Sequence, residues 1–488
     1  MARPLVLLTT EGTYPFAKGG VSTWCHVLTH QLPEVDFKLL SIVANPYLKR
    51  HYELSSNVLE VIKIPLWGTD DPVEYSWRFP FSLALKSKLD NSDRIIKTRF
   101  MPLFETWLRA VLFDELKPEK LGYLLLAIHE YFLQYDYHQT MSSVLVWSTF
   151  RYLATSYCQK QNLIGVTLAE LTEAMRLVYR LLIPIQVPVP ETDITHSSAA
   201  AFCGLPCVIA KLQRNTPYLL TEHGINIREQ YLNLNHSIPS LFVRKFLYCL
   251  MGAVVKLNFH FADRIAPVCE YNARWERWWG VPPEKIKVIY NGADPDKFHP
   301  TPPVKKERPQ VMNMGLIFPL KGQLDLIEAA AVVREQVPNV EFRFYGKPSD
   351  EAYFAKCQES VRKHNLEETI NFAGFTSEPW RAYSEADVVA MASISEGFPF
   401  AVIEAMLSGA TIVSTDVGGV REAIADTGLL VRAGRPQQLA EAILKLLLLS
   451  PEERSQYGKK ALERSLKLFT QKTFLAEHLS VYRHLNNK

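Results

Sequence analysis

The chain has 488 residues, which is enough for two or three globular domains. Hydrophobic residues make up 48% and charged residues 22%, a balance typical of a globular protein with a large core. The formal net charge is only +3, so no nucleic-acid partner is expected.

The cysteines and two apolar runs indicate the cellular compartment of the protein. Seven cysteines without a repeating spacing fit reduced thiols in a reducing compartment. The run Pro4 to Thr10 is too short for a signal peptide, and Phe246 to Val255 is too short to span a bilayer. We therefore expect a cytoplasmic protein with no transmembrane segment.

Short apolar runs alternate with helical patterns, which predicts α/β folding with parallel sheets built from βαβ units. In the first part of the chain the predicted strands are 5–9, 37–43, 59–64, 218–221, 264–268 and 287–290. In the second part they are 311–314, 340–345, 369–372, 388–392 and 411–415. Residues 323–337 carry apolar side chains at helical spacing and should cover one face of the second sheet.

A linker is predicted at residues 291–310, which hold five prolines and charges of both signs. We expect an N-terminal domain of residues 1–295 and a C-terminal domain of residues 296–468. Both would be Rossmann-like and doubly wound, facing each other across a cleft. Ligands of such sheets bind beyond the carboxyl ends of the strands.

Residues 65–190 differ from the rest because they are rich in Trp, Tyr, Phe and Leu and have weak strand signals. They predict a largely helical insertion in the N-terminal domain. Two interpretations stay open: structural padding, or a cap that binds an acceptor or docks a partner. Asp70 and Asp71 in this insertion are expected to be exposed to solvent.

The most informative segment is residues 393–406, SISEGFPFAVIEAM. A strand should end just before it, and a helix should begin near Pro399, since proline suits a first helical turn. The free amides of that turn and the helix dipole favour a diphosphate. Glu396 in the turn and Glu404 inside the helix could then bracket a sugar nucleotide, although a lone pair of glutamates would more often be solvated helix-end acids.

This segment resembles the E-x7-E signature of family 4 glycosyltransferases, which are retaining enzymes of the GT-B fold. The similarity continues through residues 409–422, GATIVSTDVGGVRE, and residues 428–431, GLLV. It extends back to 372–375, FAGF, a loop that touches the nucleobase in such enzymes. The resemblance implies a metal-independent hexosyltransferase that uses a nucleotide diphosphate sugar, with a C-terminal helix, 469–488, packing back on the N-terminal domain.

The resemblance also implies donor-binding residues, of which Lys321 and Glu396 would be catalytic as well. Lys321 and the amides after Glu396 would hold the diphosphate, Glu404 the ribose, and Glu396 the sugar. The remaining donor-binding residues would be Gly19, Gly20, Gly374, Gly397, Phe398 and Pro399. Gly19 and Gly20 follow the first strand, where two glycines let a ligand approach the backbone closely.

A strand running into the turn TEHGI places Glu222 and His223 at a strand end. A lone histidine is more often structural than catalytic, but this position favours a catalytic role. TEHGI, EGTYPFAKGGVSTW near the start and THSSAAAFCGLP around His196 are similar to the cytoplasmic glycosyltransferase of the bacterial Pel exopolysaccharide system. That subfamily implies a UDP-sugar donor, a growing exopolysaccharide as glycan acceptor, and recruitment to a membrane polysaccharide synthase complex at the inner face of the plasma membrane. Arg228, Glu222 and His196 are the candidate acceptor or supporting residues.

One position departs from the family pattern. Family 4 enzymes carry Gly-Arg after the first strand of the second domain and a Lys-Gly several residues later. Here Lys321 is present but Leu316 stands at the arginine position. Losing one such cation costs roughly 2–4 kcal/mol of transition-state stabilisation. Lys18, Arg228 or Lys347 are candidates to replace it.

A metal site is not expected. Asp294 and Asp296 form a DxD triplet, but they lie in the linker, where we interpret them as a turn and helix-cap element. No residue is a convincing covalent nucleophile, which fits a front-face transfer in which the leaving phosphate helps to deprotonate the acceptor. The alternatives are a non-catalytic nucleotide-sugar-binding subunit of a synthase complex and, less favoured, an epimerase or a phosphorylase.

Overall fold

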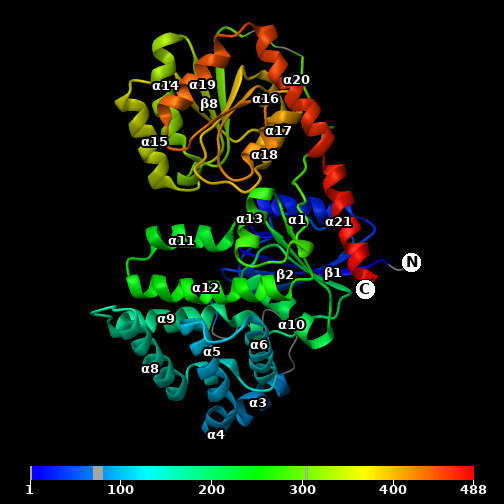
Figure 1. Ribbon diagram of the computed structural model, residues 1–488, viewed down its shortest axis with the longest axis vertical. Helices are drawn as coiled ribbons and strands as arrows, with labels where there is room; N and C mark the ends of the chain where they lie inside the picture. Colours follow the sequence, from blue (N-terminus) through cyan, green and yellow to red (C-terminus); the bar gives the residue numbers. More distant parts are fainter. Residues whose placement is uncertain (1–2, 70–80, 303, 305, 488) are drawn as a thin grey trace. The chain divides into compact units, whose positions relative to one another are not determined.

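The computed structural model describes residues 3–69, 81–302, 304 and 306–487, with the backbone alone at 233, 236 and 237. They form two compact units, coloured by sequence in Figure 1. Unit 1 comprises Met1–Pro267, Trp275–Lys287 and Leu479–Lys488, and unit 2 comprises Val268–Arg274 and Val288–His478. The domain limits expected after residues 295 and 468 remain predictions. The two compact units are defined by packing, which does not show which segments fold independently. Asp70 and Asp71 lie outside the described residues.

Unit 1 is built on a six-stranded parallel sheet in the order β3-β2-β1-β4-β5-β6. Its strands are β1 (Leu5–Glu11), β2 (Asp36–Val43), β3 (Val58–Pro65), β4 (Ile194–Ser197), β5 (Tyr218–Glu222) and β6 (Arg264–Pro267). Its central strands are buried on both faces, as the apolar runs predict. The strand order reverses between β1 and β4, which makes their carboxyl ends the place for a ligand.

The helices of unit 1 fall into two groups. Those that follow the strands are α1 (Gly20–Gln31), α10 (Leu205–Arg214), α11 (Asn226–Ser237), α12 (Leu241–Phe261) and α13 (Glu270–Trp278), of which α13 begins in unit 2. The inserted group is α3 (Phe81–Asp90), α4 (Asp93–Ile95), the π-helix Ile96–Phe100, α5 (Met101–Phe113), α6 (Pro118–Phe132), α7 (Tyr137–Met141), α8 (Val144–Lys160) and α9 (Leu168–Leu181). The described part of the insertion is thus helical, and α5, α6 and α9 pack against α12 (Figure 1).

Unit 2 repeats the same plan with a second six-stranded parallel sheet, ordered β12-β11-β10-β7-β8-β9. Its strands are β7 (Gln310–Met314), β8 (Glu341–Tyr345), β9 (Ile370–Gly374), β10 (Val388–Met391), β11 (Ile412–Thr415) and β12 (Leu429–Val431). Its helices are α14 (Gln323–Gln336), α15 (Glu351–Lys363), α16 (Pro379–Glu385), α17 (Phe400–Leu407), α18 (Val420–Ile424), α19 (Pro436–Leu447), α20 (Pro451–Leu468) and the first half of α21 (Gln471–Asn486), whose second half belongs to unit 1.

The two faces of the unit 2 sheet are covered by different helices. Leu326 and Ile327 of α14 join Ile443 of α19 in one apolar core. Val402 of α17 and Ala461 of α20 belong to the core on the other face. Two doubly wound α/β units are therefore confirmed.

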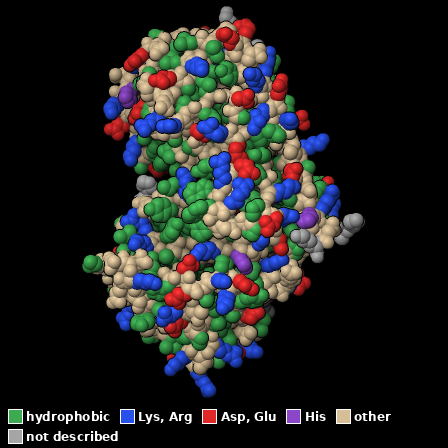
Figure 2. Space-filling model, in the orientation of Figure 1, with side chains coloured by type: hydrophobic (Ala, Val, Ile, Leu, Met, Phe, Trp, Pro, Cys, Tyr) green, Lys and Arg blue, Asp and Glu red, His purple; other side chains and the backbone are tan. Residues whose placement is uncertain are grey.

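Most predicted strands are confirmed within one or two residues, and helix 323–337 corresponds to α14. The strand predicted at 287–290 is wrong, because no strand of the described chain lies there. The Lys287 amide donates a 2.9 Å hydrogen bond to the Ile265 carbonyl of β6, but the pairing goes no further along the predicted strand. Beside them only an isolated bridge joins Ile265 to Ile286. Lys and Arg intermingle with Asp and Glu over the face shown in Figure 2, which agrees with the small net charge. Along the described residues, no helix combines the length and apolarity needed to cross a bilayer.

Candidate active site

The carboxyl ends of β7 and β10 mark the point where the strand order of the unit 2 sheet reverses. Ligands of doubly wound sheets bind outside the strands at such a point. The loop after β7 carries Leu316 and Lys321, and the loop after β10 carries Glu396. Topology alone therefore brings these two predicted segments to one edge of the sheet.

Three glycines fix the path of the loop that carries Glu396. Gly322 has a φ of 64°, and a Cβ there would lie 2.0 Å from the Ala392 carbonyl oxygen. Gly418 has a φ of 55°, and a Cβ there would lie 1.8 Å from the Glu396 carbonyl oxygen. The Gly419 amide donates a 2.7 Å hydrogen bond to the Gly397 carbonyl. Only residues without a side chain let the neighbouring loops approach this closely.

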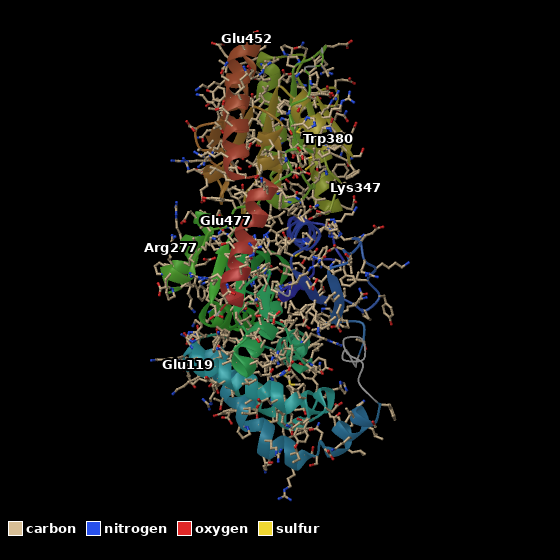
Figure 3. All side chains as sticks on the ribbon, turned by 90° about the vertical axis from the view of Figure 1, so that its right-hand side faces the viewer. Glu119, Arg277, Lys347, Trp380, Glu452 and Glu477 are labelled. Carbon is tan, nitrogen blue, oxygen red and sulfur yellow. The ribbon has the colours of Figure 1, made fainter. Side chains whose placement is uncertain are left out.

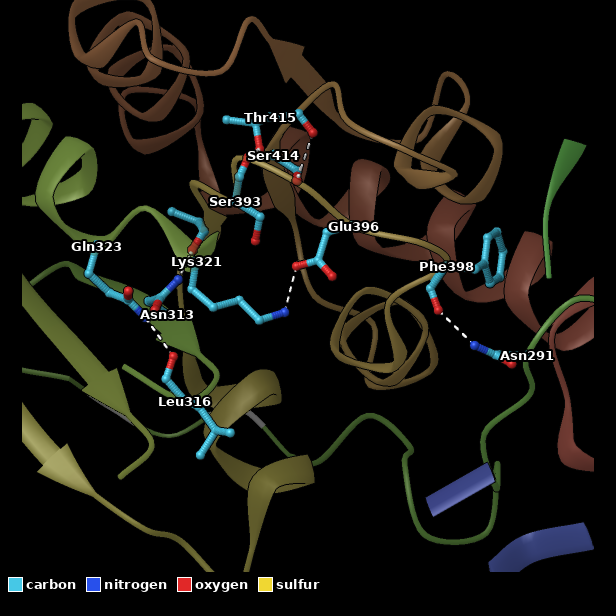
Figure 4. Close-up of polar contacts among 11 residues, drawn as sticks. Asn291, Asn313, Leu316, Lys321, Gln323, Ser393, Glu396, Phe398, Ser414 and Thr415 are labelled. Carbon is cyan, nitrogen blue, oxygen red and sulfur yellow. Dashed lines mark hydrogen bonds and ion pairs between the residues drawn. The ribbon is translucent and has the colours of Figure 1, made fainter. Parts of the chain in front are cut away.

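Lys321 and Glu396 form the polar centre of this edge (Figure 4). The lysine Nζ lies 2.6 Å from Glu396 Oε1, and the two side chains are 26% and 14% exposed. A lysine held at one position by a partly buried carboxylate is ordered before a ligand arrives. Lys321 and Glu396, predicted from separate motifs, are thus brought together.

Glu404 lies within α17 and is held separately from that pair. The Tyr383 hydroxyl donates a 3.2 Å hydrogen bond to Glu404 Oε2. Burial raises the pKa of Glu404 to about 7, against smaller lowering effects of the Tyr383 hydrogen bond and the Lys297 charge. Among the described residues no hydrogen bond joins Glu404 to Lys321 or Glu396, and its carboxyl titrates near neutral pH.

Of the other donor-binding candidates of unit 2, Gly397, Phe398 and Pro399 lie on the loop after β10, whereas Gly374 ends β9. Pro399 is the N-cap of α17, so the helix begins one residue later than a proline in the first turn would imply. The Phe398 carbonyl accepts a 2.8 Å hydrogen bond from Asn291 Nδ2 (Figure 4). Gly374 has a φ of 69° and accepts a hydrogen bond from the Gly346 amide, which ties the loop after β9 to the loop after β8.

Leu316 is 45% exposed and takes no part in the contact between Lys321 and Glu396 (Figure 4). Its carbonyl accepts a hydrogen bond from Gln323 Nε2 at 2.9 Å. An isobutyl group at this position offers no charge to an anion.

In unit 1, the glycine loop and His223 are linked through Trp24. Gly19 is the N-cap of α1, Gly20 is its first residue, and both are exposed. Trp24, buried in the second turn of α1, meets the His223 ring edge-on with centroids 4.7 Å apart. His223 itself is half-buried at the carboxyl end of β5. The orientation of the predicted catalytic histidine thus depends on the helix that the glycines open.

Two carboxylates stabilise the turn after β4. Glu222 Oε1 accepts a 2.6 Å hydrogen bond from the Ala200 amide, and Glu11 Oε2 accepts one from the Cys203 amide at 3.1 Å. Burial raises the pKa of Glu222 to about 8 and also raises the pKa of Glu11. Glu222 is only 3% exposed, so these contacts describe a supporting role for it.

His196 is fully buried on β4, with both ring nitrogens in hydrogen bonds. Its Nδ1 lies 2.7 Å from the Tyr482 hydroxyl and its Nε2 lies 2.8 Å from Thr221 Oγ1. Such a ring supports the sheet and has no free edge for a ligand. Arg228 is half-buried in the first turn of α11.

The DxD triplet forms a turn, because the Asp296 amide donates a 3.0 Å hydrogen bond to Asp294 Oδ1. Asp296 itself is exposed. The described residues contain no group of three or more His, Cys, Asp or Glu side chains placed to hold a metal ion.

Sequence reasoning missed several residues that shape the site. Tyr383, Trp24 and Glu11 were not singled out, although Glu11 lies in a motif that carried the family resemblance. A carboxylate ending a buried strand was an available signal for Glu11. Trp24 ends the same motif that Glu11 begins, whereas no local pattern marks Tyr383, because its contact with Glu404 arises only in the folded chain.

Two doubly wound parallel sheets of this order, the second with a Lys–Glu pair at its reversal point, define the GT-B architecture of glycosyltransferases. The chain belongs to the family described as Domain of unknown function (DUF3492), which matches residues 4–284. Residues 294–464 match the family described as Glycosyl transferases group 1.

A curated relative and two solved structures agree with this assignment. Trehalose synthase from Pyrococcus horikoshii is 31% identical over 195 residues, which are 38% of this chain and 45% of that protein. The chain thus spans less than half the length of this relative.

Sucrose-phosphate synthase from Thermosynechococcus elongatus is 18% identical, with a TM-score of 0.62 and 99% of each chain covered. Anabaena HepE in complex with UDP and glucose is 14% identical, with a TM-score of 0.58 over 98% of this chain and 99% of that one. At these identities the two structures show the shared fold alone.

Proposed function

We propose that this protein is a retaining family 4 glycosyltransferase that transfers a sugar from a UDP-sugar to a glycan without a metal ion. The observation that carries the proposal is the 2.6 Å contact between Lys321 and Glu396 at the reversal point of the unit 2 sheet. A cation beside a helix N-terminus is suited to a leaving diphosphate, whose charge it stabilises.

Each residue then has a distinct task. Lys321 and the first amides of α17 bind the diphosphate, Glu396 orients the sugar, and Glu404 accepts hydrogen bonds from the ribose. On entry of the donor, the Lys321 ammonium exchanges part of its contact with Glu396 for phosphate oxygens. Glu396 is thereby released to accept hydrogen bonds from sugar hydroxyls.

The retaining outcome follows from the proposed front-face transfer. The acceptor hydroxyl attacks the anomeric carbon on the face that the diphosphate leaves, and its proton passes to the departing phosphate oxygen. His223 and the Gly19–Gly20 loop of unit 1 keep their predicted catalytic and donor-binding roles in this proposal. Excluding water from the reacting centre suppresses hydrolysis of the donor.

UDP as the donor nucleotide is supported by HepE, which shares the fold and was solved with UDP and glucose. A growing exopolysaccharide as acceptor, and recruitment to a membrane polysaccharide synthase at the cytoplasmic face, are supported by the resemblance to the Pel glycosyltransferase. The exposed helical insertion is the proposed docking region for either partner.

The test is calorimetric titration of the protein with UDP, GDP and ADP in EDTA. We expect micromolar binding of UDP, lost in Glu404→Ala and kept in Glu367→Ala, which removes an exposed carboxylate of the same unit. Binding that requires added Mg²⁺ or Mn²⁺ would overturn metal independence. No binding of any nucleotide would overturn the donor site itself.

Leu316 favours a second candidate, a nucleotide-sugar-binding subunit that does not catalyse transfer. This subunit would bind UDP-sugars as tightly as an enzyme, yet the donor would stay intact with every glycan acceptor supplied. Release of UDP that depends on an acceptor, followed by NMR of the product's anomeric configuration, separates the two functions.

A further inference from the structure

The unit 2 site lacks one positive charge for the ligand that the proposed function assigns to it. Lys321 is already paired with Glu396, so the two side chains together are neutral. The neighbouring position that the family fills with arginine holds Leu316. A nucleoside diphosphate carries more than one negative charge, and Lys321 alone leaves most of it unmatched.

Lys347 follows β8 on the loop directly beside Leu316. The Gly315 amide donates to the Tyr345 carbonyl at 2.9 Å, and the Ile317 amide donates to the Lys347 carbonyl at 3.0 Å. A Cβ on Gly346 would lie 1.9 Å from the Gly315 carbonyl oxygen, so the two loops are in backbone contact. The backbone thus places Lys347 next to the position that lacks its arginine.

The Lys347 side chain is exposed (Figure 3) and held only loosely. Its Nζ lies 5.9 Å from the centroid of the Phe375 ring, a cation–π contact at the outer limit. Within the described chain no carboxylate pairs with it, whereas Arg343, on β8 itself, is ion-paired with Glu341 at 2.7 Å. Lys347 can therefore turn to an anion without breaking an ion pair.

We propose that Lys347 is the second cation that binds the donor diphosphate, in place of the arginine that Leu316 replaces. The proposal rests on the proposed function, because it assigns a residue to the same donor site. The loop after β8 supplies the charge that the loop after β7 lacks. Phe375, itself 70% exposed, makes only this weak contact with the lysine, so the ammonium can leave the ring when the ligand arrives.

The experiment compares UDP with uridine by calorimetry on four proteins: the wild type, Lys347→Met, Leu316→Arg/Lys347→Met and Lys356→Met. Lys356 is an exposed lysine of α15, so its replacement removes the same charge from the same unit. We expect Lys347→Met to weaken UDP binding about tenfold, equal to about 1.4 kcal/mol, and to leave uridine binding unchanged. The added arginine should restore most of the loss, and Lys356→Met should bind like the wild type.

Three outcomes would overturn the inference while leaving the proposed function intact. UDP binding could be unchanged in Lys347→Met. It could fall equally for UDP and uridine, which would assign Lys347 to the base or ribose. It could fall as much in Lys356→Met, which would reduce the effect to net charge. Failure of the wild type to bind UDP is a different result, and it would sink the proposed function itself.

Discussion

Replacing Gly418 by alanine should displace the loop that carries Glu396. The new Cβ would lie 1.8 Å from the Glu396 carbonyl oxygen, whereas ordinary van der Waals contact begins at 3.4 Å. The loop must therefore retreat by the difference, 3.4 − 1.8 = 1.6 Å. A misplacement of about 1 Å costs about 100-fold in rate, so we expect kcat/KM for transfer to fall by about 100-fold or more.

Gly434→Ala is the matched control. Gly434 has a φ of 68°, close to the 55° of Gly418, but a Cβ there would meet no atom within 4 Å. Both variants carry the strain of a left-handed alanine, about 1–2 kcal/mol, which thermal unfolding would measure. Only Gly418→Ala should also lose transfer activity and UDP affinity. A folded Gly418→Ala with wild-type kcat/KM, or an equal loss of activity in Gly434→Ala, would refute the reasoning.

The remaining predictions concern the protonation of Glu404 and Glu222 and the contribution of Tyr482 to stability. Tyr383→Phe removes a hydrogen bond that lowers the pKa of Glu404, so the pKa should rise above about 7. UDP binding should therefore weaken at a higher pH in Tyr383→Phe than in the wild type. Calorimetry between pH 6 and pH 9 measures this, and an unchanged pH dependence would contradict the prediction. Burial raises the Glu222 pKa from 4.5 to about 8, so the folded state holds a proton that the unfolded state has lost, and wild-type stability should decline as pH rises through that window. Glu222→Gln should flatten the decline in urea unfolding, and an equally steep decline would exclude Glu222 as its source. Tyr482→Phe should cost about 1–2 kcal/mol of stability by removing the buried hydroxyl that is hydrogen-bonded to His196 Nδ1, with UDP affinity unchanged. Weaker UDP binding in a stable Tyr482→Phe would show that His196 acts at the site.

Most of the fold could be predicted from the sequence, because buried parallel strands have continuous runs of apolar residues. β4 was missed because three of the four residues in its sequence, ITHS, are polar. Those polar groups are satisfied by tertiary partners such as Tyr482, which lies 286 residues from His196. The wrong strand at 287–290, KVIY, has the β-branched and aromatic side chains of a strand, but in the described chain its contact with β6 ends at Lys287.

The candidate site, like the fold, could be predicted only in part from the sequence. Lys321 and Glu396 come from motifs whose positions after β7 and β10 follow from strand order, so their proximity was implicit in the sequence. The near-neutral titration of Glu404 was not, because it depends on burial against Tyr383. Lys347 was one of three candidate cations by sequence, and only the backbone pairing of two loops distinguishes it.

Tyr482 completes the interior of unit 1 although it lies almost at the other end of the chain from β1. It is fully buried, it contacts His196, and its ring lies 6.4 Å from Phe37. A ribosome delivers the strands of this sheet long before it delivers residue 482. During synthesis the interior around the N-terminal sheet therefore stays incomplete until the whole of the second sheet has been synthesised. Domains that fold in order of emergence escape such a delay. In this chain the first unit to be made is the last to be finished.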